Sequence, residues 1–124
     1  MAKRPNMSKA EMEIARIVWQ LKTASARQVH DALPSTKKID FSTVQTYLTR
    51  LEEKGYIKSK KEGRAKIFSA KANPNTVIRD KVNELLDVLF DGDAVPMMRH
   101  LIQDAEISAD DVQALKKMLD ELDN

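Results

Sequence analysis

The chain has 124 residues, which suffice for one compact domain or for a small domain with an appendage, but not for a large catalytic core. It has no cysteine, which excludes disulfide bonds, thiolate zinc sites and a cysteine nucleophile. There is no run of about 18 apolar residues and no apolar segment in the charged start, so the sequence predicts neither a membrane span nor a signal peptide, and we expect a cytoplasmic protein.

The net charge of +2 hides an uneven distribution of charge along the chain. Residues 1–72 hold 16 Lys and Arg against 7 Asp and Glu, whereas residues 73–124 hold 5 against 12. Such asymmetry predicts two domains with different partners, 1–72 and 73–124, although two solvated surfaces of opposite sign would also produce a modest imbalance. The positions of the cations distinguish two domains with different partners from two ordinary solvated surfaces.

Two helices are expected near the N-terminus, each introduced by a capping box, in which a serine and a Glu or Gln three positions later bind free amides at the helix start. The pairs are Ser8 with Glu11 and Ser25 with Gln28, and they predict helices over about 9–22 and 26–33. Pro34 ends the second helix because proline cannot extend one.

A third helix is expected over about 43–54, with Ser42 as its N-cap and Gly55 as a left-handed residue after its end. Its apolar positions have the spacing of a buried helix face, and they are Val44, Tyr47, Leu48 and Leu51. Two extended segments then predict a β-hairpin over about 56–71 with a turn at Glu62-Gly63. Three helices followed by a hairpin indicate a winged helix-turn-helix, so the expected fold class is mainly α with a small β-hairpin wing.

The C-terminal region is expected to hold three further helices. The first begins at Pro74 and ends near Phe90, Asp93 caps the second, and Ser108 caps the third together with Asp111. Their apolar seams are narrow, and a region of roughly 50 residues can scarcely bury such seams within itself. We therefore expect a helical dimerisation region, with an interface made by Ile78, Val82, Leu85, Leu89, Met97, Leu101, Val112, Leu115, Leu119 and Leu122.

The outward face of the third helix is polar and contains no acid. Its residues are Ser42, Thr43, Gln45, Thr46 and Arg50. Gln can bind adenine, Thr can contact a thymine methyl group, and Arg can pair with guanine or a phosphate, so this face suits a recognition helix in the major groove of DNA. An ordinary solvated helix face would also carry Ser, Thr and Gln.

The hairpin concentrates positive charge. Lys58, Lys60, Lys61, Arg64 and Lys66 stand against a single acid, Glu62. Cations this dense repel one another unless an anion is present, and a wing lying along a phosphate backbone supplies one. A hairpin that is merely soluble would more often contain acids between the cations. We expect Lys60, Lys61, Arg64 and Lys66 to contact DNA.

No pattern in the sequence indicates an enzyme, a metal site or a cofactor. The two histidines, His30 and His100, lie on different segments without ligand spacing, and the carboxylate pairs have no catalytic neighbours or Gly-rich phosphate loop. Met97 and Met98 could line a ligand pocket, but methionines at helical spacing more often form a core.

A second class of function stays open, namely a winged-helix module that binds another protein or a structured RNA through its acidic C-terminal region. The third helix discriminates between the two classes. A protein-docking face would more often expose Leu, Phe or Tyr, whereas the outward face here is polar and non-acidic, as DNA recognition requires.

The run Ile39–Ile57, with the pattern T-V-x-T-x-L-x-R-L-x-x-K-G, and the K-x-G-R motif at Lys61–Arg64 resemble the BlaI/MecI/CopY (penicillinase repressor) family, as does Glu11–Trp19. The resemblance covers nearly the whole chain. It implies a homodimer that binds a palindromic operator in double-stranded DNA through the winged head, dimerises through the helical tail and represses transcription until released. It also implies a candidate partner, a sensor or protease acting on the tail.

The chain departs from the family pattern in three places. Ile39 stands where many members have Trp, a packing change that we expect to be tolerated. Antibiotic-responsive members are cut at an Asn-Phe bond in the tail, and the matching stretch here, Arg99–Ile102, has no Asn-Phe. Copper-responsive members carry a C-terminal cysteine motif, so the absence of cysteine excludes copper sensing of that kind.

Overall fold

The computed structural model describes residues 4–104 and 107–123, and the chain forms two compact units, Met1–Ile78 and Arg79–Asn124. The charge distribution predicted a boundary after residue 72. The first unit, the head, extends to Ile78 because the first turn of helix α4 (Pro74–Phe90) places Val77 in the core of the head.

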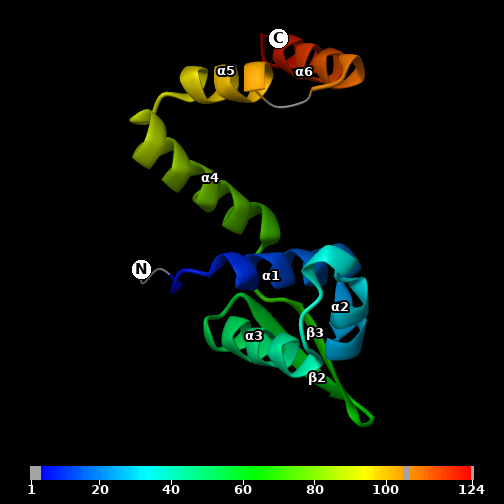
Figure 1. Cartoon of the computed structure of the whole chain (residues 1–124). Helices are drawn as coiled ribbons and strands as arrows, with labels where there is room; N and C mark the ends of the chain where they lie inside the picture. The colour runs from blue at the N-terminus through cyan, green and yellow to red at the C-terminus, as the bar shows by residue number, and fades with distance from the viewer. Residues whose placement is uncertain (1–3, 105–106, 124) are drawn as a thin grey trace. The chain divides into compact units, whose positions relative to one another are not determined.

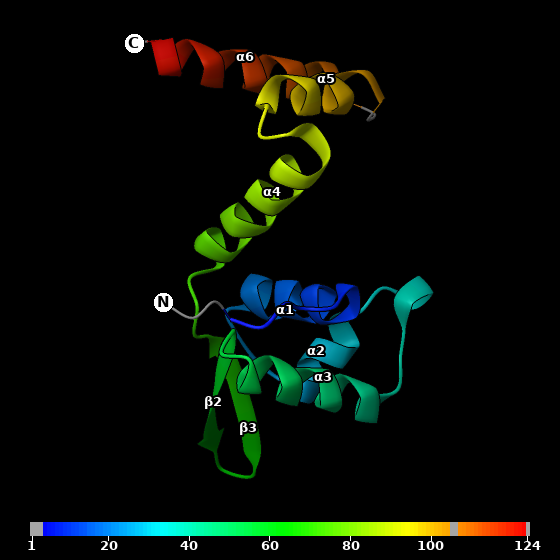
Figure 2. The same ribbon diagram turned by 90° about the vertical axis from the view of Figure 1, so that its left-hand side faces the viewer.

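The head has the element order of a winged helix. Its elements are α1 (Lys9–Leu21), β1 (Thr23–Ser25), α2 (Ala26–Ala32), the 3-10 turn η1 (Ser35–Lys37), α3 (Phe41–Glu53), β2 (Ile57–Glu62) and β3 (Ala65–Ala70). In both views of the ribbon the tip of the β2–β3 hairpin extends beyond the three helices (Figures 1 and 2). The predicted fold class, mainly α with a small β wing, is confirmed.

Both predicted capping boxes are confirmed. At the start of α1 the amide of Glu11 donates to Ser8 Oγ (3.1 Å) and the amide of Ser8 donates to Glu11 Oε1 (2.7 Å). Ser25 and Gln28 make the same exchange before α2, at 3.2 and 2.8 Å. Local chemistry in the sequence therefore determines where these two helices begin.

Helix α3 begins earlier than expected. The amides of Thr43 and Val44 donate to the carbonyl of Asp40 (3.0 and 3.1 Å), so Asp40 is the N-cap residue and the prediction that Ser42 caps the helix is wrong. Asp is a favoured N-cap residue, so position 40 carried a cap signal that competed with Ser42, although the Asp40 side chain makes no capping hydrogen bond. Ser42 lies inside the first turn.

The sheet contains one strand that the sequence did not predict. β3 lies between β1 and β2, antiparallel to both, and β1 was missed because three residues are too few for an alternating pattern. The hairpin turn lies one residue later than predicted, at Gly63-Arg64, since Glu62 pairs with Ala65. Gly63 has a φ of 63° in the first central position, as a type II′ turn requires.

Every helix and strand of the head contributes to one hydrophobic core. The largest apolar side chains that are fully buried come from all three helices and from β2: Ile14, Val18, Val29, Val44, Leu48, Leu51 and Ile57. The core therefore holds α3 by a single apolar face and leaves its opposite face to solvent.

A buried carboxylate, Glu11, joins α1 to the end of α3. It is 2% exposed, and its Oε1 accepts hydrogen bonds from the Ser8 amide and from Lys54 Nζ (2.8 Å). Lys54 is the C-cap residue of α3 and also donates to the Asn6 carbonyl (2.8 Å). Burial raises the pKa of Glu11, but the hydrogen bonds from Lys54 and Ser8 outweigh it and hold the pKa below its ordinary 4.5.

The second unit has no buried core of its own within residues 79–104 and 107–122. It contains most of α4, together with α5 (Ala94–Asp104) and α6 (Ala109–Asp123), and the caps predicted at Asp93 and Ser108 are confirmed. None of residues 79–104 and 107–122 is buried. In the part of the chain that the structure describes, no helix is long and apolar enough to span a bilayer.

Replacing Glu11 with alanine is expected to destabilise the head by about 1–3 kcal/mol, because it removes the capping box and leaves Lys54 without its carboxylate partner. The loss should be full above pH 4.5 and shrink as the pH falls through the lower folded-state pKa of Glu11, since a depressed carboxyl pKa stabilises only the ionised group. Urea unfolding at one chain concentration measures both effects.

Glu13→Ala is the matched control for this experiment. It removes a carboxylate from the same helix, but the contact of Glu13 with Lys37 (3.0 Å) lies at the surface and should contribute little. Equal destabilisation by the two substitutions would contradict a special role for the buried pair.

Candidate nucleic-acid interface

The outward face of α3 carries the predicted recognition residues. Ser42, Gln45, Thr46 and Arg50 are exposed and Thr43 is half-buried. A shallow surface hollow on this face is lined by Ser42, Thr43, Thr46, Tyr47 and Arg50. The structure therefore brings four of the five predicted residues together, and Gln45 lies outside the lining of the hollow.

Tyr47 belongs to this face, although the sequence predicted that it points inward. It is half-buried and lines the hollow, and the Arg50 guanidinium lies 5.9 Å from the centre of its ring. That distance suits a cation–π contact, which restricts the Arg50 side chain. Helical spacing alone cannot distinguish a core tyrosine from one at the edge of the core, but the hydroxyl of Tyr favours the edge.

The hydroxyl groups on α3 are oriented by the helix itself. Thr46 Oγ1 donates to the Ser42 carbonyl (3.0 Å), and Thr49 Oγ1 donates to the Gln45 carbonyl (2.9 Å). Each hydroxyl proton is thereby used, so Thr46 offers its methyl group and its oxygen lone pairs outward. Such a side chain can contact a thymine methyl group or accept from a base amino group.

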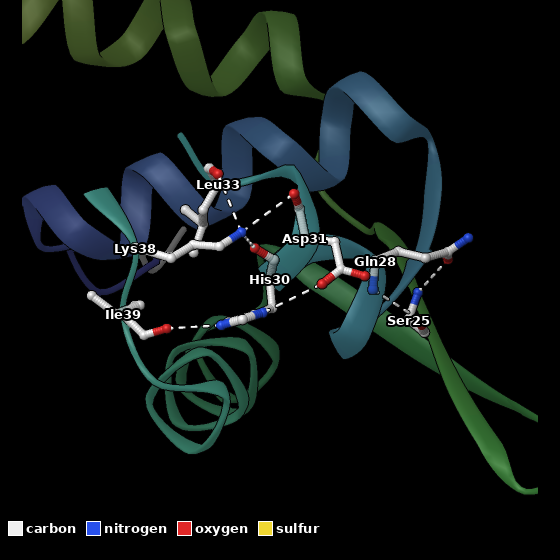
Figure 3. A network of polar contacts seen from close by, with 7 residues as sticks. All are labelled: Ser25, Gln28, His30, Asp31, Leu33, Lys38 and Ile39. Carbon is white, nitrogen blue, oxygen red and sulfur yellow. Dashed lines mark hydrogen bonds and ion pairs between the residues drawn. The ribbon is translucent and has the colours of Figure 1, made fainter. Parts of the chain in front are cut away.

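Polar contacts hold the connection between α2 and α3 (Figure 3). The Lys38 ammonium donates to the His30 carbonyl at 2.8 Å and lies 3.4 Å from the carbonyls of Asp31 and Leu33, so it binds the C-terminal end of α2. His30 Nε2 lies 2.9 Å from the carbonyl of Ile39, to which a protonated Nε2 donates. These bonds fix the segment that leads into α3.

Aromatic contacts secure the first residue of α3. The Arg27 guanidinium lies 4.1 Å from the centre of the Phe41 ring, and the His30 ring meets the same ring edge-on at 6.0 Å. Both contacts come from α2. They fix the N-terminal end of α3, where a recognition helix contacts bases.

The cations of the hairpin differ in their surroundings. Lys60, Lys61 and Arg64 are exposed, and no described residue forms an ion pair with them. Lys66 Nζ instead lies 3.1 Å from Glu52 Oε1 and 5.5 Å from the centre of the Phe68 ring. Paired strand residues share a face, so Lys61 and its partner Lys66 lie on one face of the hairpin and Lys60 lies on the other.

The predicted dimer residues lie exposed or half-buried on the C-terminal helices. Leu85, Leu101 and Leu119 are 49%, 49% and 63% exposed, and Met97 and Leu115 are half-buried. Further exposed apolar side chains outside the predicted interface are Val88, Val95, Met98, Ile102 and Met118. The stretch Arg99–Ile102 lies within α5.

Groups that would indicate a metal centre are not found in the described residues. No cluster of three or more His, Cys, Asp or Glu side chains among them could hold an ion. His100 pairs with Asp104 on the surface of α5 (2.5 Å), and His30 is used in the connection described above.

Three comparisons place the chain among known proteins. Its residues 7–121 match the family described as penicillinase repressor. The penicillinase repressor of Bacillus licheniformis is 27% identical over 124 residues, which cover all of this chain and 97% of that protein. The methicillin resistance regulatory protein MecI of Staphylococcus aureus (strain N315) is 23% identical over 113 residues, covering 91% of this chain and 92% of that one.

A solved structure indicates the same family as the sequence relatives. The head resembles the monomeric form of Bacillus licheniformis BlaI in complex with the blaP half-operator, with a TM-score of 0.51 and 31% identity. The match covers 60% of this chain and 92% of that chain. With a family match over 115 of its 124 residues and a winged-helix head of the same kind, the chain belongs to the penicillinase repressor family.

Proposed function

We propose that the chain is a homodimeric, sequence-specific repressor that places α3 in the major groove of an operator and the β2–β3 wing on the adjacent phosphates. The observation that carries this proposal is the polar face of α3, which is free of acids from Ser42 to Arg50, beside a hairpin whose exposed cations form no ion pair with a described residue. Related proteins support it, since the family is one of penicillinase repressors and the BlaI structure holds a half-operator.

In this proposal the side chains of α3 have different roles. Gln45 and Arg50 make bidentate contacts to base edges. Thr43 and Thr46 contact thymine methyl groups, and Ser42 contacts the DNA near the start of the helix. Lys60, Lys61 and Arg64 bind phosphates, which position the head without reading the sequence. Occupation of the operator would repress transcription by blocking a promoter.

A second copy of the chain is proposed to cover the apolar residues of the tail. The absence of any buried residue in 79–104 and 107–122 supports this, because helices with exposed Leu and Val need a partner surface. The acidic charge of residues 73–124 would be repelled by DNA and so would turn the basic heads toward it. Two heads related by a two-fold axis would read half-sites about 10 base pairs, or a multiple of that, apart.

Binding of the upstream promoter DNA tests the function directly. Fluorescence anisotropy with the promoter duplex and a scrambled duplex of equal length is expected to give at least about a thousandfold preference for the promoter and a steep dependence on salt. Equal weak binding to both duplexes would contradict sequence-specific recognition there. No binding at low salt would favour a winged-helix module that docks on protein or RNA.

Arg50→Ala is expected to cost about 1–3 kcal/mol of operator binding and to relax specificity, because one bidentate base contact is lost. The same titration measures it, with operators substituted at single base pairs. Arg16→Ala is the control, since Arg16 is exposed on α1 and its removal changes the net charge equally. An equal loss on every DNA sequence would make Arg50 a phosphate contact instead.

Leu85→Asp and Leu119→Asp are each expected to dissociate the dimer and weaken operator binding, because a carboxylate would be buried in an apolar interface. Analytical ultracentrifugation measures the oligomeric state. Asn83→Asp adds the same charge at an exposed polar position of α4 and should leave the dimer intact. If the Leu85 and Leu119 variants remain dimeric, the proposed interface is misplaced.

A further inference from the structure

One carboxylate, Glu52, connects the last turn of α3 to both strands of the wing. Its Oε2 accepts a hydrogen bond from the Ser59 hydroxyl of β2 (2.5 Å), and its Oε1 lies 3.1 Å from Lys66 Nζ of β3. The side chain is 31% exposed, so water screens these contacts only in part. A single side chain therefore bridges the helix and the hairpin.

The surroundings of Glu52 keep it ionised. The hydrogen bond from Ser59, helped by Lys66, outweighs the opposing effect of burial and holds the pKa of Glu52 below 4.5. An ionised carboxylate in the last turn of α3 would repel DNA phosphates unless a cation of the protein neutralised it. Lys66 is that cation, so the positive charge of Lys66 is already neutralised by Glu52 within the head.

The register of the hairpin gives the Glu52–Lys66 pair a second effect. Lys66 pairs directly with Lys61 across the hairpin, and like charges in directly opposed positions destabilise a strand pair. By neutralising Lys66, Glu52 relieves that repulsion near the tip of the wing, one pair before the turn. Lys61 remains the free cation of this pair.

We infer that Glu52 is a positioning residue that holds the wing against α3 through Ser59 and Lys66. In this inference Lys66 pairs with Glu52 within the protein and does not contact a phosphate. This inference rests on the proposed DNA-binding function. Recognition needs the bases read by α3 and the phosphates bound by the wing to be in register, so loosening the wing lowers operator preference. The expectation from charge density that Lys66 contacts DNA is thereby replaced.

The decisive comparison is Glu52→Ala with Glu53→Ala. Both remove one negative charge from the same turn of α3, but Glu53 is exposed and no described residue forms an ion pair with it. In full-length protein Glu52→Ala is expected to lose about five- to tenfold in preference for promoter over scrambled duplex, which corresponds to one or two weakened contacts. Glu53→Ala should keep the wild-type preference, and equal preference in the two variants would overturn the inference.

The salt dependence of DNA binding shows whether Lys66 acts within the protein or contacts a phosphate. Lys66→Ala is expected to leave the slope of log K against log salt unchanged, whereas Lys61→Ala should lower it by about one unit. The double variant Glu52→Ala/Lys66→Ala should bind no more weakly than Glu52→Ala alone, because the two residues act through one contact. A slope lowered by about one in Lys66→Ala would show that Lys66 binds phosphate and would overturn the inference.

Amide hydrogen exchange in the free protein tests the wing without DNA. Exchange over residues 57–70 is expected to be faster in Glu52→Ala than in Glu53→Ala, and equal exchange would contradict the role of Glu52 in holding the wing. If the wild type binds no DNA at any salt, the proposed function fails and the recognition role of Glu52 fails with it. The exchange experiment would still decide whether Glu52 holds the wing.

Discussion

The contact between Glu11 and Lys54 is the interaction on which the placement of α3 depends most. The core holds α3 by one apolar face, which resists separation but permits small rotation and sliding, because hydrophobic contact is not directional. Hydrogen bonds to base edges tolerate little displacement, since they weaken steeply with distance and angle. A charged bond at the C-terminal end of α3, with the contacts of Phe41 at the other end, removes the freedom that the core leaves.

The C-terminal helices differ from α3 in having no core to hold them, because none of residues 79–104 and 107–122 is buried. If a second copy covers them, the folding of this region and dimerisation are one equilibrium, and chain concentration contributes to both. Two linked heads bind two half-sites with a high effective concentration for the second. Any signal that separates the copies or unfolds the tail would then lower operator affinity without touching a base-contacting residue.

Features that depend on neighbours in the sequence could be predicted, and features that depend on distant residues could not. The two capping boxes and the apolar positions Val44, Leu48 and Leu51 are encoded within single helices. By contrast, β1 is a strand only because β3 pairs with it, and the edge position of Tyr47 follows from how α3 packs. The Glu11–Lys54 contact joins residues 43 positions apart, which no local pattern reveals.

The count of cations in the sequence therefore overstates the charge available to DNA. Among the described residues of the head, four lysines are engaged within the protein: Lys37, Lys38, Lys54 and Lys66. In the same order, their partners are Glu13, the carbonyl groups at the end of α2, Glu11 and Glu52. Lys60, Lys61 and Arg64 of the hairpin and Arg50 on the outward face of α3 form no ion pair with a described residue, so the surface that would meet the phosphates keeps its positive field, although exposed cations such as Arg16 also lie on α1. By pairing with Lys66, Glu52 therefore affects both which cations are available to DNA and how the wing is placed.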